Sequence, residues 1–141
     1  MTKECIRGMM GALDLWNLVV IPSLMNNCST WIGMTSRQEK KLESLQEQFI
    51  RMMMEVPVST PKLALRAETG LLSMKHRVWV EKLNLVLAIQ KSAGLAKNVY
   101  LEQLNHNWPG LAVETRQMCE ALGMNDVNFH NVKMQDIMKA V

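Results

Sequence analysis

The aspartates are the first residues to consider, because metal-dependent phosphoryl chemistry needs carboxylates that converge on a cation. The sequence has only three, Asp14, Asp126 and Asp136, and no two of them are adjacent or separated by one residue. This scatter predicts no two-metal centre of the polymerase type, unless the fold brings distant carboxylates together. We therefore expect no catalytic aspartate.

The histidines give no stronger signal for catalysis. None of His76, His106 and His130 has a histidine partner four residues away, as a zinc-protease helix requires. No spacing points to Cys–His or Ser–His catalysis, and no glycine-rich phosphate loop occurs. We predict that the chain is not an enzyme, holds no metal and uses no cofactor. An enzyme of unrecognised type stays open as an alternative.

The three cysteines, Cys5, Cys28 and Cys119, lie far apart and form no CxxC pair. This pattern favours buried thiols in a reducing compartment over a disulfide framework or a zinc site. No apolar run approaches the roughly 20 residues that span a bilayer, and no signal-peptide pattern follows the first basic residues. We predict an intracellular protein, nuclear or cytoplasmic, with no membrane partner.

Basic residues are concentrated in the middle of the chain. Residues 62–97 hold seven lysines and arginines and two glutamates, a net charge of +5. Residues 1–61 hold six of each sign, and residues 98–141 hold three basic and five acidic residues. The middle segment therefore predicts a surface that faces an acidic partner. An ordinary solvated surface that happens to be basic is the alternative.

Helical spacing gives the basic residues of this segment some order. Lys62 and Arg66 are one turn apart, and Lys75 and Lys82 are seven residues apart and hence on one side of a helix. Arg77 is expected to pair with Glu81 at i+4. Together these residues would form a cationic ridge, and such a ridge binds phosphates without sequence specificity. The predicted nucleic-acid-binding residues are Lys62, Arg66, Lys75, Arg77 and Lys82.

The elements that position these residues are predicted to be helices throughout. Thr35 and Gln38 form a capping box, Thr60 and Pro61 mark a second helix start, and Gly70 is a left-handed helix end. No stretch alternates as a strand does. The predicted helices cover about 2–22, 36–56, 61–69, 74–92, 95–105, 111–122 and 131–141.

These elements predict an all-α fold, an orthogonal array of about six or seven helices with no substantial sheet. We expect residues 1–141 to form a single helical domain. Pro22 is expected to kink the first helix or restart it. The predicted core contains Leu13, Trp16, Leu42, Leu45, Phe49, Met52, Leu65, Trp79, Leu83 and Val86.

Four segments, in this order, resemble a known family. They are Ile21-Pro22-Ser23-Leu24-Met25-Asn26-Asn27 with Thr30-Trp31; Leu42-x-x-Leu45-Gln46-x-x-Phe49-Ile50-Arg51; Val56-Pro57-x-Ser59-Thr60-Pro61; and Leu65-Arg66-Ala67-Glu68-Thr69-Gly70-Leu71-Leu72 with Lys75-His76-Arg77. The set resembles the region just downstream of the palm in non-LTR retrotransposon reverse transcriptases. The likeness covers roughly residues 10–92.

The resemblance implies a helical thumb in residues 1–92 and a trailing helical linker in residues 93–141. In that family the thumb grips the backbone of the template–primer duplex. The aromatic-x-Asp-Asp motif of the RNA-directed DNA polymerase lies upstream of this region and is absent here, as are the fingers and palm. The resemblance therefore implies a truncated, non-catalytic fragment, whose partners are a nucleic-acid duplex and the missing palm and fingers.

The alternative function is a helical protein–protein interaction module with no role in nucleic-acid binding. Thirteen methionines are many for 141 residues, and flexible thioethers suit adaptable partner surfaces. For the run Met52-Met53-Met54, ordinary core packing of two of the three is the favoured interpretation. A thumb without its palm also leaves an apolar flank exposed, which predicts marginal stability or self-association.

Overall fold

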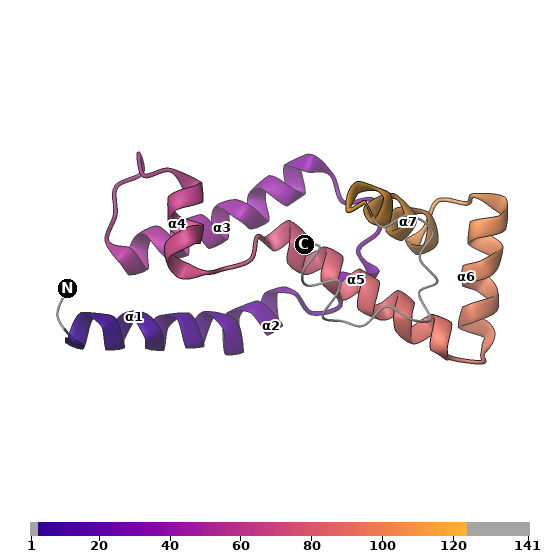
Figure 1. Cartoon of the computed structure of the whole chain (residues 1–141), viewed down its shortest axis with the longest axis horizontal. Coiled ribbons are helices and arrows are strands. Elements are labelled where there is room, and N and C mark those ends of the chain that lie inside the picture. Colours follow the sequence, from indigo (N-terminus) through magenta and orange to yellow (C-terminus); the bar gives the residue numbers. More distant parts are fainter. Residues whose placement is uncertain (1–2, 124–141) are drawn as a thin grey trace. The chain divides into compact units, whose positions relative to one another are not determined.

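The computed structural model describes residues 3–123, and its elements are helices joined by turns, with no strand within that range (Figure 1). The prediction of an all-α fold is confirmed. The residues form two compact units, which are described separately. Of the described residues, unit 1 contains those up to Asn26 together with Thr35–Lys75, and unit 2 contains Asn27–Met34 and those from His76 onward. The helix predicted at 131–141 lies outside the described range, and so do Asp126, His130 and Asp136.

Unit 1 begins with one helical run that changes its geometry just before Pro22, as predicted. A proline inside a regular α-helix clashes with the carbonyl four residues earlier and donates no hydrogen bond. The chain widens into a π-helical turn here, where the N–H of Ile21 donates to the carbonyl of Trp16. The elements are α1 (Lys3–Leu15), the π-helical turn (Trp16–Val20) and α2 (Ile21–Leu24).

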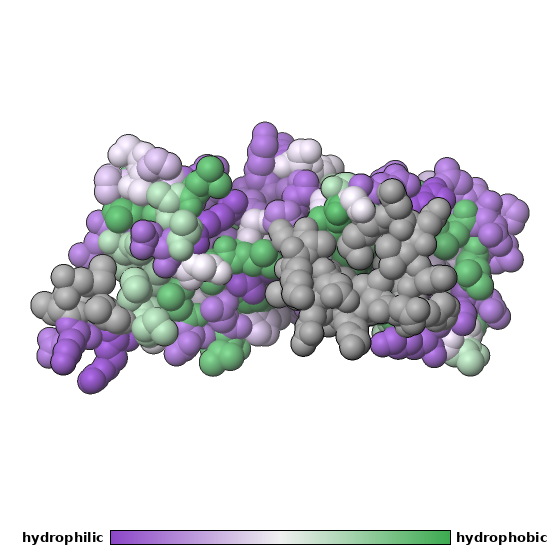
Figure 2. Space-filling view, viewed as in Figure 1, coloured by the Kyte–Doolittle hydropathy of each residue, from purple (hydrophilic) through white to green (hydrophobic). Residues whose placement is uncertain are grey.

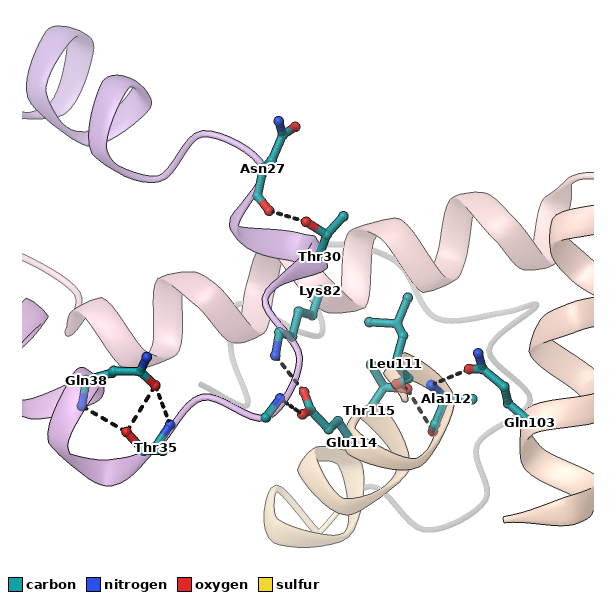
Figure 3. Close-up of polar contacts among 11 residues, drawn as sticks. Asn27, Thr30, Thr35, Gln38, Lys82, Gln103, Leu111, Ala112, Glu114 and Thr115 are labelled. Atoms are coloured by element: carbon teal, nitrogen blue, oxygen red, sulfur yellow. Dashed lines mark hydrogen bonds and ion pairs between the residues drawn. The ribbon is translucent and has the colours of Figure 1, made fainter. Parts of the chain in front are cut away.

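Helix α3 (Ser36–Met54) starts at the predicted capping box. The backbone N–H of Thr35 donates to Gln38 Oε1 at 2.8 Å, and the N–H of Gln38 donates to Thr35 Oγ1 at 3.4 Å (Figure 3). Two N–H groups that α-helical bonding leaves unpaired are thereby satisfied. The helix ends where Glu55 adopts the left-handed conformation, two residues before Pro57.

Replacing Thr35 with alanine is expected to destabilise unit 1 by about 1 kcal/mol, because the cap hydroxyl is lost while the helix keeps its unpaired N–H. Urea denaturation followed by circular dichroism measures this change. Thr35→Gly is the matched variant, and it should lose only a few tenths of a kcal/mol, since glycine is tolerated as a cap. Equal losses in the two variants would contradict a capping role.

The core of unit 1 lies where the first helical run meets α3. The rings of Trp16 and Phe49 stack with centroids 4.2 Å apart, and Ile50 is buried. Leu65 of α4 is buried as well, as predicted. Leu13, Leu42 and Phe49, also predicted for the core, are half-buried.

Two predicted core residues of α3 are wrong, since Leu45 is 46% and Met52 is 74% exposed. The inward line of the helix runs through Gln46 and Ile50 instead. The amide of the fully buried Gln46 is satisfied in part, because its Nε2 donates to the carbonyl of Leu72 at 3.1 Å. A polar side chain with a backbone partner therefore occupies a position that an apolar pattern assigned to its neighbour.

Helix α4 (Lys62–Thr69) follows a tight turn and completes unit 1 with the segment to Lys75. Its cap is Pro61, not the hydroxyl of Thr60, so the helix begins one residue later than predicted. Pro61 has an extended backbone, which the fixed φ of proline permits. Gly70 ends the helix in the predicted left-handed conformation, with φ at 64°.

Unit 2 is built mainly from three helices. Its two apolar clusters confirm Leu83 and Val86 as core residues, whereas the predicted Trp79 is half-buried. Cys28, in a short 3-10 turn (Cys28–Thr30), is buried too. The helices are α5 (Met74–Lys91, whose first two residues belong to unit 1), α6 (Leu95–His106) and α7 (Leu111–Ala121).

Candidate nucleic-acid interface

Three ion pairs join α3 to the basic segment that follows it, and we call them the acid–base ladder. Three glutamates four residues apart share one side of α3, because four residues are close to one helical turn. Their cationic partners follow in reverse order along the chain, because the segment after α3 runs back along that helix in the opposite direction. The pairs are Glu47 Oε1 with Lys62 Nζ at 3.1 Å, Glu43 Oε2 with Arg66 Nη2, and Glu39 Oε2 with Lys75 Nζ at 3.7 Å.

The cation is the outer member of every pair in the ladder. The side chain of Lys62 is 65% exposed, whereas that of its partner Glu47 is 12% exposed, and the other two pairs follow the same order. Glu43 lies deep enough to accept a second hydrogen bond, from the backbone N–H of Lys75 at 3.0 Å. An anion that approaches this side of unit 1 therefore meets ammonium and guanidinium groups before carboxylates.

Lys82 was predicted to belong to this surface, and that prediction is wrong. Its side chain is 2% exposed, and its Nζ lies 2.6 Å from Oε2 of Glu114 on α7 (Figure 3). The wide apolar arc of α5 is buried on several sides, so the position seven residues after Lys75 points into unit 2. A buried ammonium needs a carboxylate partner, and Glu114 supplies it.

Arg77 is half-buried, and burial lowers the pKa of its guanidinium below the usual value. It belongs to unit 2, together with Lys82. The structure thus brings together three of the five predicted residues, Lys62, Arg66 and Lys75, in unit 1. The expected ion pair of Arg77 with Glu81 stays a prediction.

A second group of cations lies on α3 itself, and sequence reasoning missed it. Arg37, Lys40 and Lys41 are exposed, and no other residue of the described range pairs with them. Ser44 and Gln48 continue the same face, where Gln48 Nε2 donates to Ser44 Oγ at 3.4 Å. Counting charges over residues 1–61 gave zero and hid this face, whereas helical spacing applied to the charges alone would have found it.

The two described cysteines behave as the sequence predicted. Cys28 and Cys119 are free thiols in buried positions. Burial raises the pKa of both thiols above the usual value, with a smaller contribution from Glu81 at Cys28 and from Glu120 at Cys119. Because the thiolate is the reactive form, both side chains are poor nucleophiles at neutral pH.

Comparison of the chain with family models, curated proteins and solved structures gave no match. Within residues 3–123, no group of three or more His, Cys, Asp and Glu side chains is placed to hold a metal ion. None of the helices in that range combines the length and the apolar character needed to cross a membrane.

Proposed function

We propose that this chain is a non-catalytic helical module that binds the backbone of a nucleic-acid duplex without sequence preference. The proposal rests mainly on the acid–base ladder, in which each cation is more exposed than the carboxylate that it pairs with. The ordered resemblance to the thumb of non-LTR reverse transcriptases supports the same function. In this proposal the chain acts beside a separate palm and fingers, and RNA-directed DNA polymerase activity belongs to those parts.

Cations that already have a carboxylate partner can still bind phosphate. An exposed ion pair contributes only about 0–1 kcal/mol, so it holds the side chain in place without fully satisfying it. The ammonium of Lys62 has three N–H donors and is held near Glu47 Oε1 by an ion pair at 3.1 Å. Its side chain is 65% exposed, so its donors can reach a phosphate oxygen.

A salt titration tests this function. Each phosphate contact contributes about −0.9 to the slope of log K against log salt for B-DNA. The three ladder cations therefore predict a slope of about −2.7 or steeper, measured by fluorescence anisotropy with a labelled duplex of mixed sequence. A scrambled duplex should bind equally well. A folded sample that does not bind at low salt would contradict nucleic-acid binding.

A protein-interaction module is the second candidate, and exposed apolar side chains favour it. Apolar residues interrupt the hydrophilic surface in several places (Figure 2). In unit 1, Met52, Val58 and Leu63 are 74%, 86% and 78% exposed. Isolated exposed apolar residues are ordinary, so this candidate requires self-association or partner binding that does not weaken with salt.

A further inference from the structure

We infer that the phosphate-binding surface of unit 1 extends onto the outer face of α3, where Arg37, Lys40 and Lys41 make its strongest contacts. This inference rests on the proposed function, because it names the residues through which a duplex is held. It adds a group of residues that the sequence prediction did not contain. We call Arg37, Lys40, Lys41, Ser44 and Gln48 the outer face of α3.

The geometry of α3 gathers these five side chains on one side. Arg37, Lys41, Ser44 and Gln48 follow one another at steps of four, three and four residues, which is the repeat of one helical face, and Lys40 lies beside them. All five are exposed. The buried residues Gln46 and Ile50 occupy the opposite side, so this face points away from the core of unit 1.

The same helix separates its charges by sign. Its glutamates Glu39, Glu43 and Glu47 are engaged in the ladder, so they are turned toward Lys75, Arg66 and Lys62. The cations of the outer face have no such partner in the described part of the chain. Lys40 precedes Glu43 by three residues, so on the helix surface it lies between the ladder and the rest of the outer face. The ladder and the outer face therefore lie on adjoining sides of α3, where one phosphate backbone can contact the cations of both.

The cations of the outer face are poorly placed for the stability of the helix. Arg37 and Lys41 are like charges one turn apart, and such pairs destabilise a helix. They also lie in the first two turns, at the end of the helix dipole that disfavours positive charge. A bound phosphate relieves both repulsions. The ladder cations gain less from a phosphate, because a carboxylate already neutralises each of them.

The extent of the outer face suits a duplex strand. Arg37 and Gln48 are eleven residues apart, which corresponds to about 16 Å along the helix at 1.5 Å per residue. A DNA strand places one phosphate about every 3.4 Å along the duplex axis, so this length follows several phosphates. The hydroxyl of Ser44 and the amide of Gln48 add neutral hydrogen-bonding groups, which commonly contact phosphate and sugar.

A lipid surface fits this face less well than a duplex. A helix that lies on a membrane turns its apolar side toward the acyl chains. The inward side of α3, with Ile50 and half-buried Phe49, is already packed within unit 1. The outer face itself carries charged, hydroxyl and amide groups, and only Leu45 and Met52 among the large apolar residues of α3 are exposed beside it. Electrostatic attraction without apolar insertion is what a phosphate backbone uses.

The test compares two variants of the full chain that lose the same number of charges. R37Q/K40Q/K41Q neutralises the outer face, and K3Q/R7Q/K91Q neutralises three exposed cations elsewhere. If the three ladder cations and the three outer-face cations each contact one phosphate, the wild-type slope of log K against log salt is expected to be about −5.4. The outer-face variant should fall to about −2.7 and bind about a hundredfold or more weakly at 0.1 M salt. The matched control should stay near the wild-type slope.

The outcomes separate the inference from the proposed function. A wild-type slope near about −2.7 that the outer-face variant leaves unchanged overturns the inference, while ladder binding stands. Absence of binding by the folded wild-type chain overturns both. Anionic vesicles are the third arm: binding to them that depends on the outer face, with no binding to the duplex, overturns the choice of partner.

Folding of the variants is checked by circular dichroism. Glutamine has nearly the helix propensity of lysine and arginine, so the helical signal should be unchanged. The double variant R37Q/K41Q keeps Lys40 and the Thr35–Gln38 cap, and it removes the like-charge pair. Its slope of log K against log salt should become less steep by the contribution of about two phosphate contacts. Its unfolding midpoint should stay at the same urea concentration or rise. An unchanged slope in this variant would also count against the inference.

Discussion

Replacing Glu114 with alanine is expected to destabilise unit 2 by about 3–5 kcal/mol, because it leaves the ammonium of Lys82 buried without a counter-charge. The side chain of Lys82 is 2% exposed and its Nζ lies 2.6 Å from Glu114 Oε2. The other carboxylate oxygen of Glu114 accepts a hydrogen bond from the backbone N–H of Gly33. A single substitution thus removes the partner of a buried cation and of a backbone donor.

Two further variants identify which of these losses matters. Lys82→Met should be milder than Glu114→Ala, because Glu114 is 22% exposed, keeps its bond to Gly33 and regains water. Glu120→Ala, at an exposed position of the same helix, is the matched control and should change the free energy of unfolding by less than about 0.5 kcal/mol. Urea denaturation at neutral pH measures all three. A loss below about 1 kcal/mol in Glu114→Ala would contradict the role assigned to this pair.

The helices were predictable because their boundaries are set by residues close in sequence. Thr35 with Gln38 begins α3, and Gly70 ends α4, through local backbone geometry that no distant residue has to supply. The change of geometry before Pro22 follows from the proline ring alone. The π-helical form of this change was not predictable in the same way: the carbonyl of Trp16 accepts its hydrogen bond, and the ring of Trp16 stacks on Phe49 of α3, which is distant in sequence.

The candidate site was predictable only in part, because the environment of a charge depends on distant residues. Lys62 and Arg66 were rightly placed together from their spacing, but their glutamate partners lie on another helix. Lys82 lies seven residues after Lys75 and was therefore predicted on the same exposed side of α5, but Glu114 on α7 allows it to be buried. No periodicity within α5 distinguishes a lysine whose side chain is 43% exposed beside its carboxylate from one that is buried against it.

The neutral charge of the first 61 residues illustrates the same limit. A sum over a segment treats a carboxylate and an ammonium as cancelling, wherever they point. On α3 the carboxylates turn toward the ladder and the cations Arg37, Lys40 and Lys41 turn outward. A segment with no net charge can therefore present a cationic face, provided that a second element supplies partners for its acids.

Replacing Trp16 with alanine is expected to destabilise unit 1 by about 3–5 kcal/mol, the usual loss for a large buried aromatic side chain. Trp16 is 5% exposed and stacks on Phe49 with centroids 4.2 Å apart, and such a pair adds about 0.5–1.5 kcal/mol beyond its buried area. Urea denaturation followed by circular dichroism measures the loss. Trp108→Ala is the matched control, and it should have a small effect because Trp108 is 55% exposed.

The conservative variant Trp16→Phe separates stacking from the polar edge of the indole. The buried Nε1 of Trp16 has no hydrogen-bond partner among the described residues. A buried donor without a partner costs about 1–3 kcal/mol, and phenylalanine removes this donor while it keeps a ring to stack on Phe49. The smaller ring leaves some space unfilled, so the two effects oppose each other, and the variant should lie within about 1.5 kcal/mol of the wild type. A loss as large as that of Trp16→Ala would show that the indole N–H is bonded and that its bond, rather than the stacked ring, holds the π-helical turn to α3.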